Sequence, residues 1–405
     1  MPYLSKLEID EYRHLRNIEI DCGEDGKHLI LTGPNGSGKS TILTIIRNEL
    51  HHQIFNHRSG PVWRQAPLES RVVNLESMVT NLESRVTNRK ANETSLERDH
   101  FPSCRITFTG NSIPRKDTHS QSVLAYFDPY RKPDFIEPAG PKSHELSSNQ
   151  FRLDTNISDL LLQVFVNQKT QQAYATVEDE HSTVEAINKW FDTMRATLSI
   201  IFDDPKLELI FERDKFLYRI RLGDHRIIDF NDLADGHKAA LAIVADLLIR
   251  KDIIIQESGF LEPDGIVLID EIETHLHLKL QEVIFPFLCN LFPKVQFIVA
   301  THSPAVIASV DNAIIYDLEL KRQVNSSELQ GIRYGTLMTS HFGISSDFDL
   351  QTTTKLEELK QLYRKERDEN EEQKMRQLAE ELSETSHALA LEVLLDLKSS
   401  QLSHD

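Results

Sequence analysis

Cysteine is scarce in this sequence, whose 405 residues include only Cys22, Cys104 and Cys289. The three lie far apart along the chain, so their spacing suits neither a disulfide framework nor a zinc cluster. Such usage is typical of ordinary residues in a reducing compartment. We therefore predict a cytoplasmic location.

Long apolar runs are also lacking. No run approaches the ~20 consecutive apolar residues that a membrane-spanning helix needs. The first residues, Met1-Pro2-Tyr3, do not begin a signal peptide. We expect no membrane partner.

Basic residues are outnumbered by acidic ones. The chain has 45 Lys and Arg against 63 Asp and Glu, a formal net charge of −18 at pH 7. Non-specific nucleic-acid binding depends on neutralising phosphates with Lys and Arg, so this balance works against it. Any contact with DNA or RNA is expected through a local patch or a partner.

Nuclease motifs are missing as well. The sequence shows neither a TOPRIM-like acidic constellation nor a His/Cys metal spacing. We expect His51, His52, His275 and His277 to be solvated or packed rather than metal ligands. The chain is therefore expected to carry no nuclease site of its own.

A phosphate-binding loop is what the sequence does contain. The apolar run 29–31 leads into Gly-x-x-x-x-Gly-Lys-Ser, the Walker A pattern, and a helical pattern over 41–50. A strand, a glycine-rich turn and a helix N-terminus in this order let backbone N–H groups surround phosphates. Lys39 is expected to reach the β- and γ-phosphates and act in catalysis, and Ser40 to hold Mg²⁺. The predicted nucleotide-binding residues are Gly33, Pro34, Asn35, Gly36, Ser37, Gly38, Lys39, Ser40 and Thr41.

Two further strand-like runs end in polar residues. The run 265–269 ends in Asp270 and Glu271, the Walker B pattern. Asp270 is expected to hold Mg²⁺ and Glu271 to polarise the attacking water. The run 295–300 ends in a Thr-His-Ser triplet with His302 at its centre. Because ligands of open α/β sheets lie at the carboxyl ends of strands, His302 is a candidate sensor of the γ-phosphate.

Between these motifs, a short turn with Gly236 opens an apolar helical pattern that continues to Ile249. The N-terminus of such a helix can face an anion. The order of phosphate loop, turn and helix, Asp-Glu pair and strand-end His resembles the ATP-binding cassette, in its SMC, RecF and OLD branch. That resemblance implies an α/β P-loop ATPase head with mixed sheets. It further implies two heads that sandwich ATP, with the turn residues Ala234, Asp235, Gly236 and Lys238 serving the nucleotide of the other protomer.

Three other segments narrow the resemblance. Residues 125–131, 166–173 and 270–277 look like the ATPase subunits of the Septu and retron-associated anti-phage systems, and the similarity covers most of 1–316. It implies Mg²⁺-dependent ATP binding and hydrolysis coupled to a head-to-head dimer or higher oligomer. It also implies control of a separately encoded effector, an HNH-class nuclease, during phage defence.

The turn departs from the family pattern. Where the family carries Leu-Ser-Gly-Gly, this chain has Leu-Ala-Asp-Gly at 233–236. A Ser hydroxyl would donate to the γ-phosphate, a bond worth about 1.5–3 kcal/mol to a charged group. We expect Asp235 to cap the helix, while its charge repels phosphate, and Lys238 to offset part of the loss. ATP binding should survive, and any loss should fall on turnover or head closure.

Residues 68–88 contain three nearly identical heptads. Leucines and valines alternate at spacings of four and three, with Leu at d and Val at a, which favours parallel dimers. The alternatives are a coiled coil between two chains and a helix or hairpin that packs on its own head. The apolar positions are Leu68, Val72, Leu75, Val79, Leu82 and Val86.

These observations divide the chain into six segments. The ATPase head is predicted at 1–60, which includes the phosphate loop, at 101–140, which holds head strands, and at 206–320. Between these lie the heptad insertion at 61–100 and a helical subdomain at 141–205, and 321–405 is predicted to be a helical, partner-binding extension. Alternation over 207–212 and 216–222 predicts a β-hairpin. An apolar stripe over 389–397 docks either on its own domain or on a partner.

Two other functions stay open at this point. A RecF-like repair ATPase that acts directly on DNA would need a local basic face despite the acidic total. A scaffold that is locked by ATP and turns it over little would fit the Ala234 departure.

Overall fold

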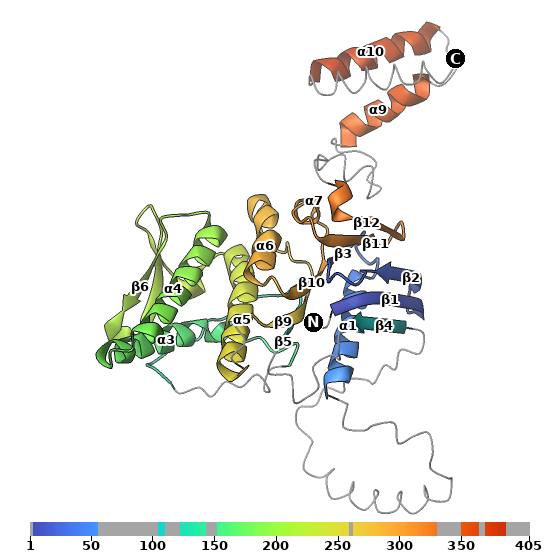
Figure 1. Ribbon diagram of the computed structural model, residues 1–405. Coiled ribbons are helices and arrows are strands. Elements are labelled where there is room, and N and C mark those ends of the chain that lie inside the picture. Colours follow the sequence, from blue (N-terminus) through green and yellow to red (C-terminus); the bar gives the residue numbers. More distant parts are fainter. Residues whose placement is uncertain are drawn as a thin grey trace, which may run out of the picture. The chain divides into compact units, whose positions relative to one another are not determined.

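The structure is a computed structural model that describes residues 3–55, 104–109, 122–142, 152–258, 262–329, 350–363 and 369–385. The chain forms two compact units, Met1–Gln330 and Gly331–Asp405 (Figure 1). The heptads at 68–88 and the apolar stripe at 389–397 lie outside the described residues. Both stay predictions.

A six-stranded sheet forms the centre of the first unit, with the strand order β12-β11-β3-β10-β9-β5. All neighbours are parallel except β12, which runs antiparallel to β11. The parallel strands are nearly continuous apolar runs, as expected for strands covered on both faces. Their bounds are β3 His28–Thr32, β5 Ser122–Phe127, β9 Asp264–Ile269, β10 Val295–Ala300, β11 Ala313–Asp317 and β12 Arg322–Asn325.

The strand register brings the carboxyl ends together. Leu31 lies opposite Ala300, and Ile269 lies opposite both Val299 and Phe127. The residues that follow β3, β10, β9 and β5 therefore emerge at the same edge of the sheet. The strand with the candidate sensor, β10, lies between the strand of the phosphate loop and the Walker B strand.

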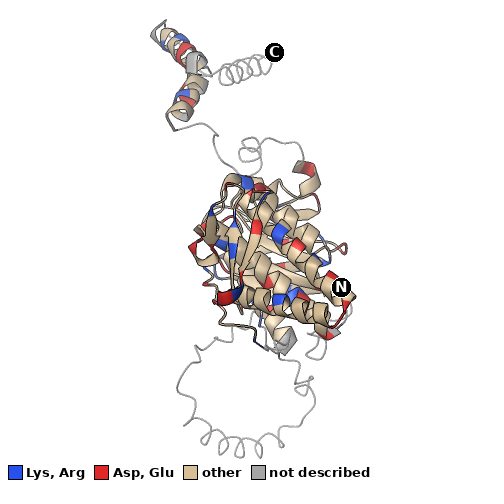
Figure 2. Ribbon diagram, turned by 90° about the vertical axis from the view of Figure 1, so that its left-hand side faces the viewer, with Lys and Arg blue, Asp and Glu red and all other residues tan. Residues whose placement is uncertain are grey.

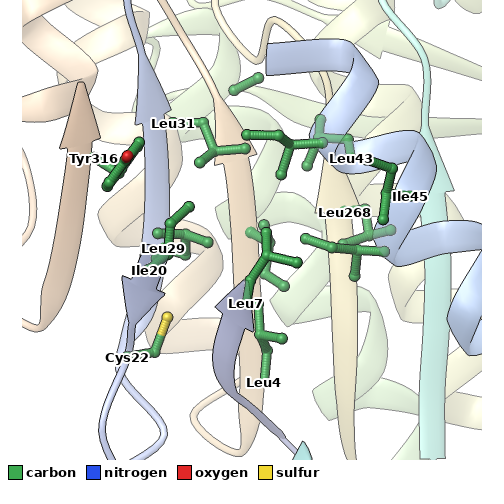
Figure 3. Packing of buried hydrophobic residues seen from close by; sticks show 14 of the residues in the cluster. Leu4, Leu7, Ile20, Cys22, Leu29, Leu31, Leu43, Ile45, Leu268 and Tyr316 are labelled. Atoms are coloured by element: carbon green, nitrogen blue, oxygen red, sulfur yellow. The ribbon is translucent and has the colours of Figure 1, made fainter. Parts of the chain in front are cut away.

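One face of this sheet shares a core with helix α1 (Lys39–Phe55) and with a three-stranded antiparallel sheet. That second sheet has the order β2-β1-β4, with β1 Tyr3–Tyr12, β2 Leu15–Asp21 and β4 Cys104–Thr109. Figure 3 shows Leu7 of β1 and Leu43 of α1 close to Leu29, Leu31 and Leu268 of the large sheet. The antiparallel sheet thus fixes the β1–β2 turn relative to the strand of the phosphate loop.

The opposite face is covered by α5 (Asp235–Ser258) and α6 (Leu278–Leu291), with the short α7 (Pro304–Ile307) beside α6 (Figure 1). Phe285 of α6 contacts the rings of Phe297 and His28 in edge-to-face geometry. The apolar helix predicted after Gly236 is confirmed as α5.

A buried ion pair ties α5 to β5 and to the segment that follows residue 151. Arg250 pairs with Asp246, and its guanidinium also donates to the carbonyls of Leu124 and Thr155. Asp246 accepts a bond from the N–H of Ile157 at 2.8 Å. Breaking such a buried pair is costly, so this link holds α5 in place.

The middle of the first unit confirms the predicted helices and hairpin. Its helices are α3 (Leu161–Val177) and α4 (His181–Phe202), and a three-stranded sheet follows, with β6 (Glu208–Glu212), β7 (Leu217–Arg221) and β8 (Ile227–Asp229). Short 3₁₀ turns join these elements: η5 Ser158–Leu160, η6 Arg213–Lys215 and η7 Phe230–Asp232. The ring of Phe165 on α3 contacts Trp190, Phe191, Tyr218 and Phe230, which joins α3 and α4 to β7 and η7.

The first unit extends beyond the boundary that was expected at residue 320. Strand β12 pairs with β11, and η8 (Ser326–Leu329) follows it directly. The second unit contains α9 (Leu350–Tyr363) and α10 (Glu369–Thr385), which pack through Leu356, Leu359, Leu378 and Leu382. Both helices lie in the segment 321–405 that was predicted to be a helical extension.

Charged residues of both signs are interspersed over the described elements of the first unit (Figure 2). Many form exposed ion pairs, such as Lys6 with Glu19 at 2.7 Å and Lys279 with Asp203. Exposed pairs of this kind contribute little to stability. None of the helices in the described part of the chain combines the length and apolar character needed to cross a membrane.

Candidate nucleotide-binding and catalytic site

The predicted phosphate loop lies between β3 and α1 and has the backbone that its glycines allow. Gly33, Gly36 and Gly38 have φ values of 132°, 80° and 107°, which side-chain-bearing residues rarely adopt. A Cβ atom on Gly38 would lie 2.4 Å from Leu15 Cδ2 and 2.8 Å from His14 Nε2. The β1–β2 turn therefore closes over the loop, and a side chain at position 38 would strain the backbone and displace the ends of the Leu15 and His14 side chains.

Lys39 lies folded against this loop. Its side chain is 5% exposed, and Nζ donates to the carbonyls of Gly33 at 2.9 Å and Pro34 at 3.1 Å. Burial lowers the pKa of Lys39, while the carboxylates of Glu271 and Asp270 act in the opposite direction. The amine is thus within electrostatic reach of the residues that end β9.

Asp270 has the features of a cation ligand. It is 1% exposed, and its Oδ1 has no hydrogen-bond partner. Burial raises the pKa of its carboxyl group, and a hydrogen bond with the Ser40 side chain opposes that rise. A buried carboxylate oxygen beside a hydroxyl is the kind of oxygen pair that binds Mg²⁺. Ser40 and Asp270 therefore fit the predicted metal site.

Glu271 is the second residue after β9 and has a left-handed backbone conformation, with φ 47°. The hydroxyl of Thr274 is 3.2 Å from its Oε2 and donates to it, and the N–H of Thr274 donates to its carbonyl at 3.0 Å. A tight turn after the strand thus holds the residue that we predicted to polarise water. Residues in rare backbone conformations cluster at functional sites.

His302 follows β10 as predicted, and Glu273 holds it from the turn that follows the neighbouring strand β9. The N–H of His302 donates to Glu273 Oε1. Burial and the charge of Lys39 lower the pKa of His302, while Glu273 raises it. Two atoms of this pair, His302 Nε2 and Glu273 Oε2, are buried without a hydrogen-bond partner. Both atoms are suited to contact a ligand that enters the site.

Sequence analysis missed two residues of this site, Glu273 and Arg131. Glu273 lies two residues after Glu271, in a run used only for the resemblance. Arg131 follows β5, is 7% exposed and donates from Nη1 to the carbonyl of Asp270 at 2.7 Å and from Nη2 to that of Glu271 at 2.7 Å. The sequence did hold one indication of their role: both residues come shortly after apolar strands that end at this edge of the sheet.

In the turn before α5, the residue that caps the helix is not the one that was expected. The carbonyl of Ala234 accepts the N–H of Lys238 at 3.0 Å, which makes Ala234 the N-cap of α5. The expected capping by Asp235 is therefore wrong. Asp235 is the first helical residue, and its carboxylate is exposed and 3.2 Å from Lys132 Nζ.

Other contacts place this turn beside the residues that follow Walker B. A Cβ on Gly236 would lie 2.4 Å from the carbonyl oxygen of His275. Lys238 Nζ donates to the carbonyl of Asn231 within the same chain. His277 is exposed and caps α6, since its Nδ1 accepts the N–H of Leu280 at 3.2 Å. The role of the turn on the nucleotide of a second copy stays a prediction.

Comparison with known proteins supports this description. A family model described as "AAA domain, putative AbiEii toxin, Type IV TA system" matches residues 114–308. The Septu protein PtuA of Bacillus mycoides is 24% identical over 358 residues, which are 84% of this chain and 44% of that protein. The Septu protein PtuA of Bacillus thuringiensis is 24% identical over 83% of this chain and 81% of its own length.

A third relative is the Retron Ec83 probable ATPase of Escherichia coli, which is 32% identical over 43% of this chain and 34% of that protein. The chain thus spans less than half the length of two of these relatives. The resemblance to Septu and retron ATPases is confirmed by these relatives. The predicted fold class, an α/β P-loop ATPase with mixed sheets, is confirmed by the sheets and the loop described above.

Proposed function

We propose that this chain is the ATPase component of an anti-phage defence system, and that it binds and hydrolyses Mg²⁺-ATP. One observation carries the proposal. Lys39, Asp270, Glu271 and His302 follow three adjacent strands, and the charges of Asp270 and Glu271 raise the pKa values of both Lys39 and His302 against the effect of burial. This arrangement can bind a triphosphate, neutralise its charge and activate water at a single edge of the sheet.

The residues divide the work as follows. The loop N–H groups and Lys39 bind the phosphates, and Lys39 exchanges its two carbonyl contacts for phosphate oxygens. Ser40 and Asp270 hold Mg²⁺, which neutralises phosphate charge when bound. Glu271 orients and polarises the attacking water. His302, whose pKa burial lowers, contacts the γ-phosphate through Nε2.

The defence role follows from the relatives. Two are named Septu protein PtuA and one a retron ATPase. We propose further that the chain pairs with itself head to head, or forms a higher oligomer, and controls a separately encoded effector, an HNH-class nuclease. The predicted cytoplasmic location belongs to the same proposal.

Phosphate release by the purified full chain tests the enzymatic part. The wild type should release phosphate only with both ATP and Mg²⁺. Glu271→Gln should keep ATP binding and lose about 10²–10⁴-fold in turnover, because a general base is removed. Lys39→Ala should weaken ATP binding by about 10–150-fold, since a charged contact of about 1.5–3 kcal/mol is lost. Equal activity of all three proteins would overturn the proposal.

The partner is tested by purification from the native host. We expect a stable complex with a second, separately encoded chain, identified by mass spectrometry and weighed intact by native mass measurement. A chain that purifies without any stoichiometric partner, and protects cells from phage when expressed alone, would contradict control of a separate effector.

An ATP-locked scaffold is the second candidate function, and the turn before α5 favours it. Ala234 offers no hydroxyl to a γ-phosphate, and the Asp235 carboxylate lies beside it. If turnover drives the switch, Glu271→Gln should abolish phage protection, whereas a scaffold should keep it. Ala234→Ser, with Ala234→Gly as a control for helix capping, should speed phosphate release in a turnover enzyme. A scaffold would show no such gain.

A further inference from the structure

Arg131 holds the two peptide carbonyls that flank the Cα atom of Glu271. Its Nη1 donates to the carbonyls of Asp128 at 2.8 Å and Asp270 at 2.7 Å, and its Nη2 donates to that of Glu271 at 2.7 Å. The side chain is 7% exposed. A planar guanidinium is suited to this task, because its donors lie in a fixed fork that can reach two acceptors at once.

The backbone at Glu271 explains why such a fork is needed. Its φ of 47° is one that residues other than glycine, Asn and Asp rarely adopt. The carbonyls of Asp270 and Glu271 accordingly both point at one cation. If the guanidinium were absent, both carbonyls would lose a charged donor and the turn would lose the contact that favours this conformation.

Arg131 also begins a segment that reaches the turn before α5. The next residue, Lys132, pairs with Asp235 at 3.2 Å. Three residues after Lys132, Phe135 forms two backbone bonds of 2.9 Å with the Asn231 side chain: its N–H donates to Asn231 Oδ1, and its carbonyl accepts from Asn231 Nδ2. The carbonyl of Asn231 in turn accepts Lys238 Nζ. Residues 131–135 thus connect the Walker B end to the turn.

We propose that Arg131 is a positioning residue for hydrolysis: it sets the direction of the Glu271 carboxylate. Through residues 131–135, the orientation of that carboxylate also depends on the turn before α5. The inference rests on the proposed ATPase function. Arg131 acts through Glu271 and does not contact the nucleotide. Its loss should therefore lower kcat and leave nucleotide binding unchanged.

Arg131→Lys tests this in the full chain, because Lys keeps the charge but lacks the planar fork whose two nitrogens hold the carbonyls of Asp270 and Glu271 in fixed directions. We expect kcat to fall by about 10²-fold, the effect of a misplaced catalytic group, while KM and the Kd for a fluorescent ATP analogue change by less than about threefold. Arg250→Lys is the matched control, since Arg250 is also buried and donates to carbonyls but lies outside the site. It should lower Tm and leave kcat within about threefold.

Two further measurements complete the test. Arg131→Lys added to Glu271→Gln should cause little additional loss, because both changes act on the same group. Asn231→Ala, which leaves Arg131 buried, should lower kcat less than Arg131→Lys does, again at constant KM, and keeps the test valid if Arg131→Lys fails to fold.

The outcomes separate this inference from the proposed function. A wild type without Mg²⁺-ATP turnover would refute the ATPase itself. An active wild type with unchanged kcat in Arg131→Lys, or a loss that multiplies with that of Glu271→Gln, would refute the positioning role. Unchanged kcat in Asn231→Ala would refute the connection to the turn.

Discussion

Buried polar atoms without hydrogen-bond partners mark this site residue by residue. Such atoms are costly in a folded protein unless a ligand, an ion or water binds them. Several lie on the residues at the carboxyl edge of the sheet: Ser37 Oγ, Asp270 Oδ1, Glu273 Oε2 and His302 Nε2. The first comes from the phosphate loop, the others from the ends of β9 and β10, and all are suited to contacts with a bound nucleotide and its cation.

Glu273 should support turnover mainly as a hydrogen-bond acceptor rather than through its negative charge, because its Oε1 accepts the N–H of His302. Glu273→Gln keeps an acceptor there, so turnover should stay within about threefold. Glu273→Ala leaves that N–H unpaired at a cost of about 1–3 kcal/mol, and turnover should fall by about tenfold or more. Phosphate release by the pair measures this. Equal losses in both variants would instead favour a role for the charge.

His28 predicts a pH dependence of stability. Burial lowers its pKa to about 4, and its Nδ1 accepts the N–H of Phe297 at 3.1 Å. The unfolded chain takes up a proton near pH 6.5 and the folded chain does not, so stability is complete above that pH and is lost as the pH falls toward 4. Between pH 7.5 and pH 5 this group should remove about 2 kcal/mol.

Urea unfolding, followed by tryptophan fluorescence at both pH values, measures this effect. His28→Asn keeps an acceptor but cannot titrate, so its loss of stability over the same pH range should be smaller than that of the wild type by about 2 kcal/mol. An identical pH dependence in both proteins would show that His28 does not titrate as described.

At the scale of elements, sequence analysis succeeded where the signal is local. Two patterns that predicted elements correctly each lie within a dozen residues. They are the run 29–31 with the glycines and Lys39 that follow it, and the alternation over 207–212. Arg131 was missed because its acceptors on Asp270 and Glu271 lie 139 and 140 residues away. Strand β12 was missed because Arg-Gln-Val-Asn carries no apolar period and is a strand only by pairing with β11. The role of Arg131 and the existence of β12 both depend on contacts with residues far away in the sequence, so a local sequence pattern cannot predict either of them.

The close contact between the β1–β2 turn and the phosphate loop predicts how glycine substitutions in the loop affect ATP binding. Gly38→Ala should weaken ATP binding, because φ is 107° and the new Cβ would lie 2.4 Å from Leu15 Cδ2, whose side chain would have to shift. Gly36→Ala is the matched control, with φ 80° but no atom within 4 Å of its Cβ. It should carry only the backbone cost of about 1–2 kcal/mol.

Titration with a fluorescent ATP analogue, together with a melting curve for each variant, measures the difference. Gly38→Ala should lose binding more than Gly36→Ala does. If both variants bind ATP like the wild type, the turn does not close over the loop as described.

At the scale of the whole molecule, the acidic total and the interspersed charges of the first unit (Figure 2) fit a chain that works through protein partners. The second unit adds a helix pair with its own small apolar core. The heptads over 68–88 add a predicted helix that either pairs between copies or packs within one chain. In the proposed mechanism, the nucleotide site of the first unit is completed by the turn before α5 of a second copy.

Head closure on ATP is therefore the central claim, and light scattering of the Glu271→Gln chain with Mg²⁺ tests it most directly. This variant binds ATP and should hold it without turnover. We predict that saturating ATP, but not ADP, doubles the mass of the ATP-free species, and that adding Lys39→Ala abolishes the change. A mass that stays the same in ATP, ADP and no nucleotide would contradict the account.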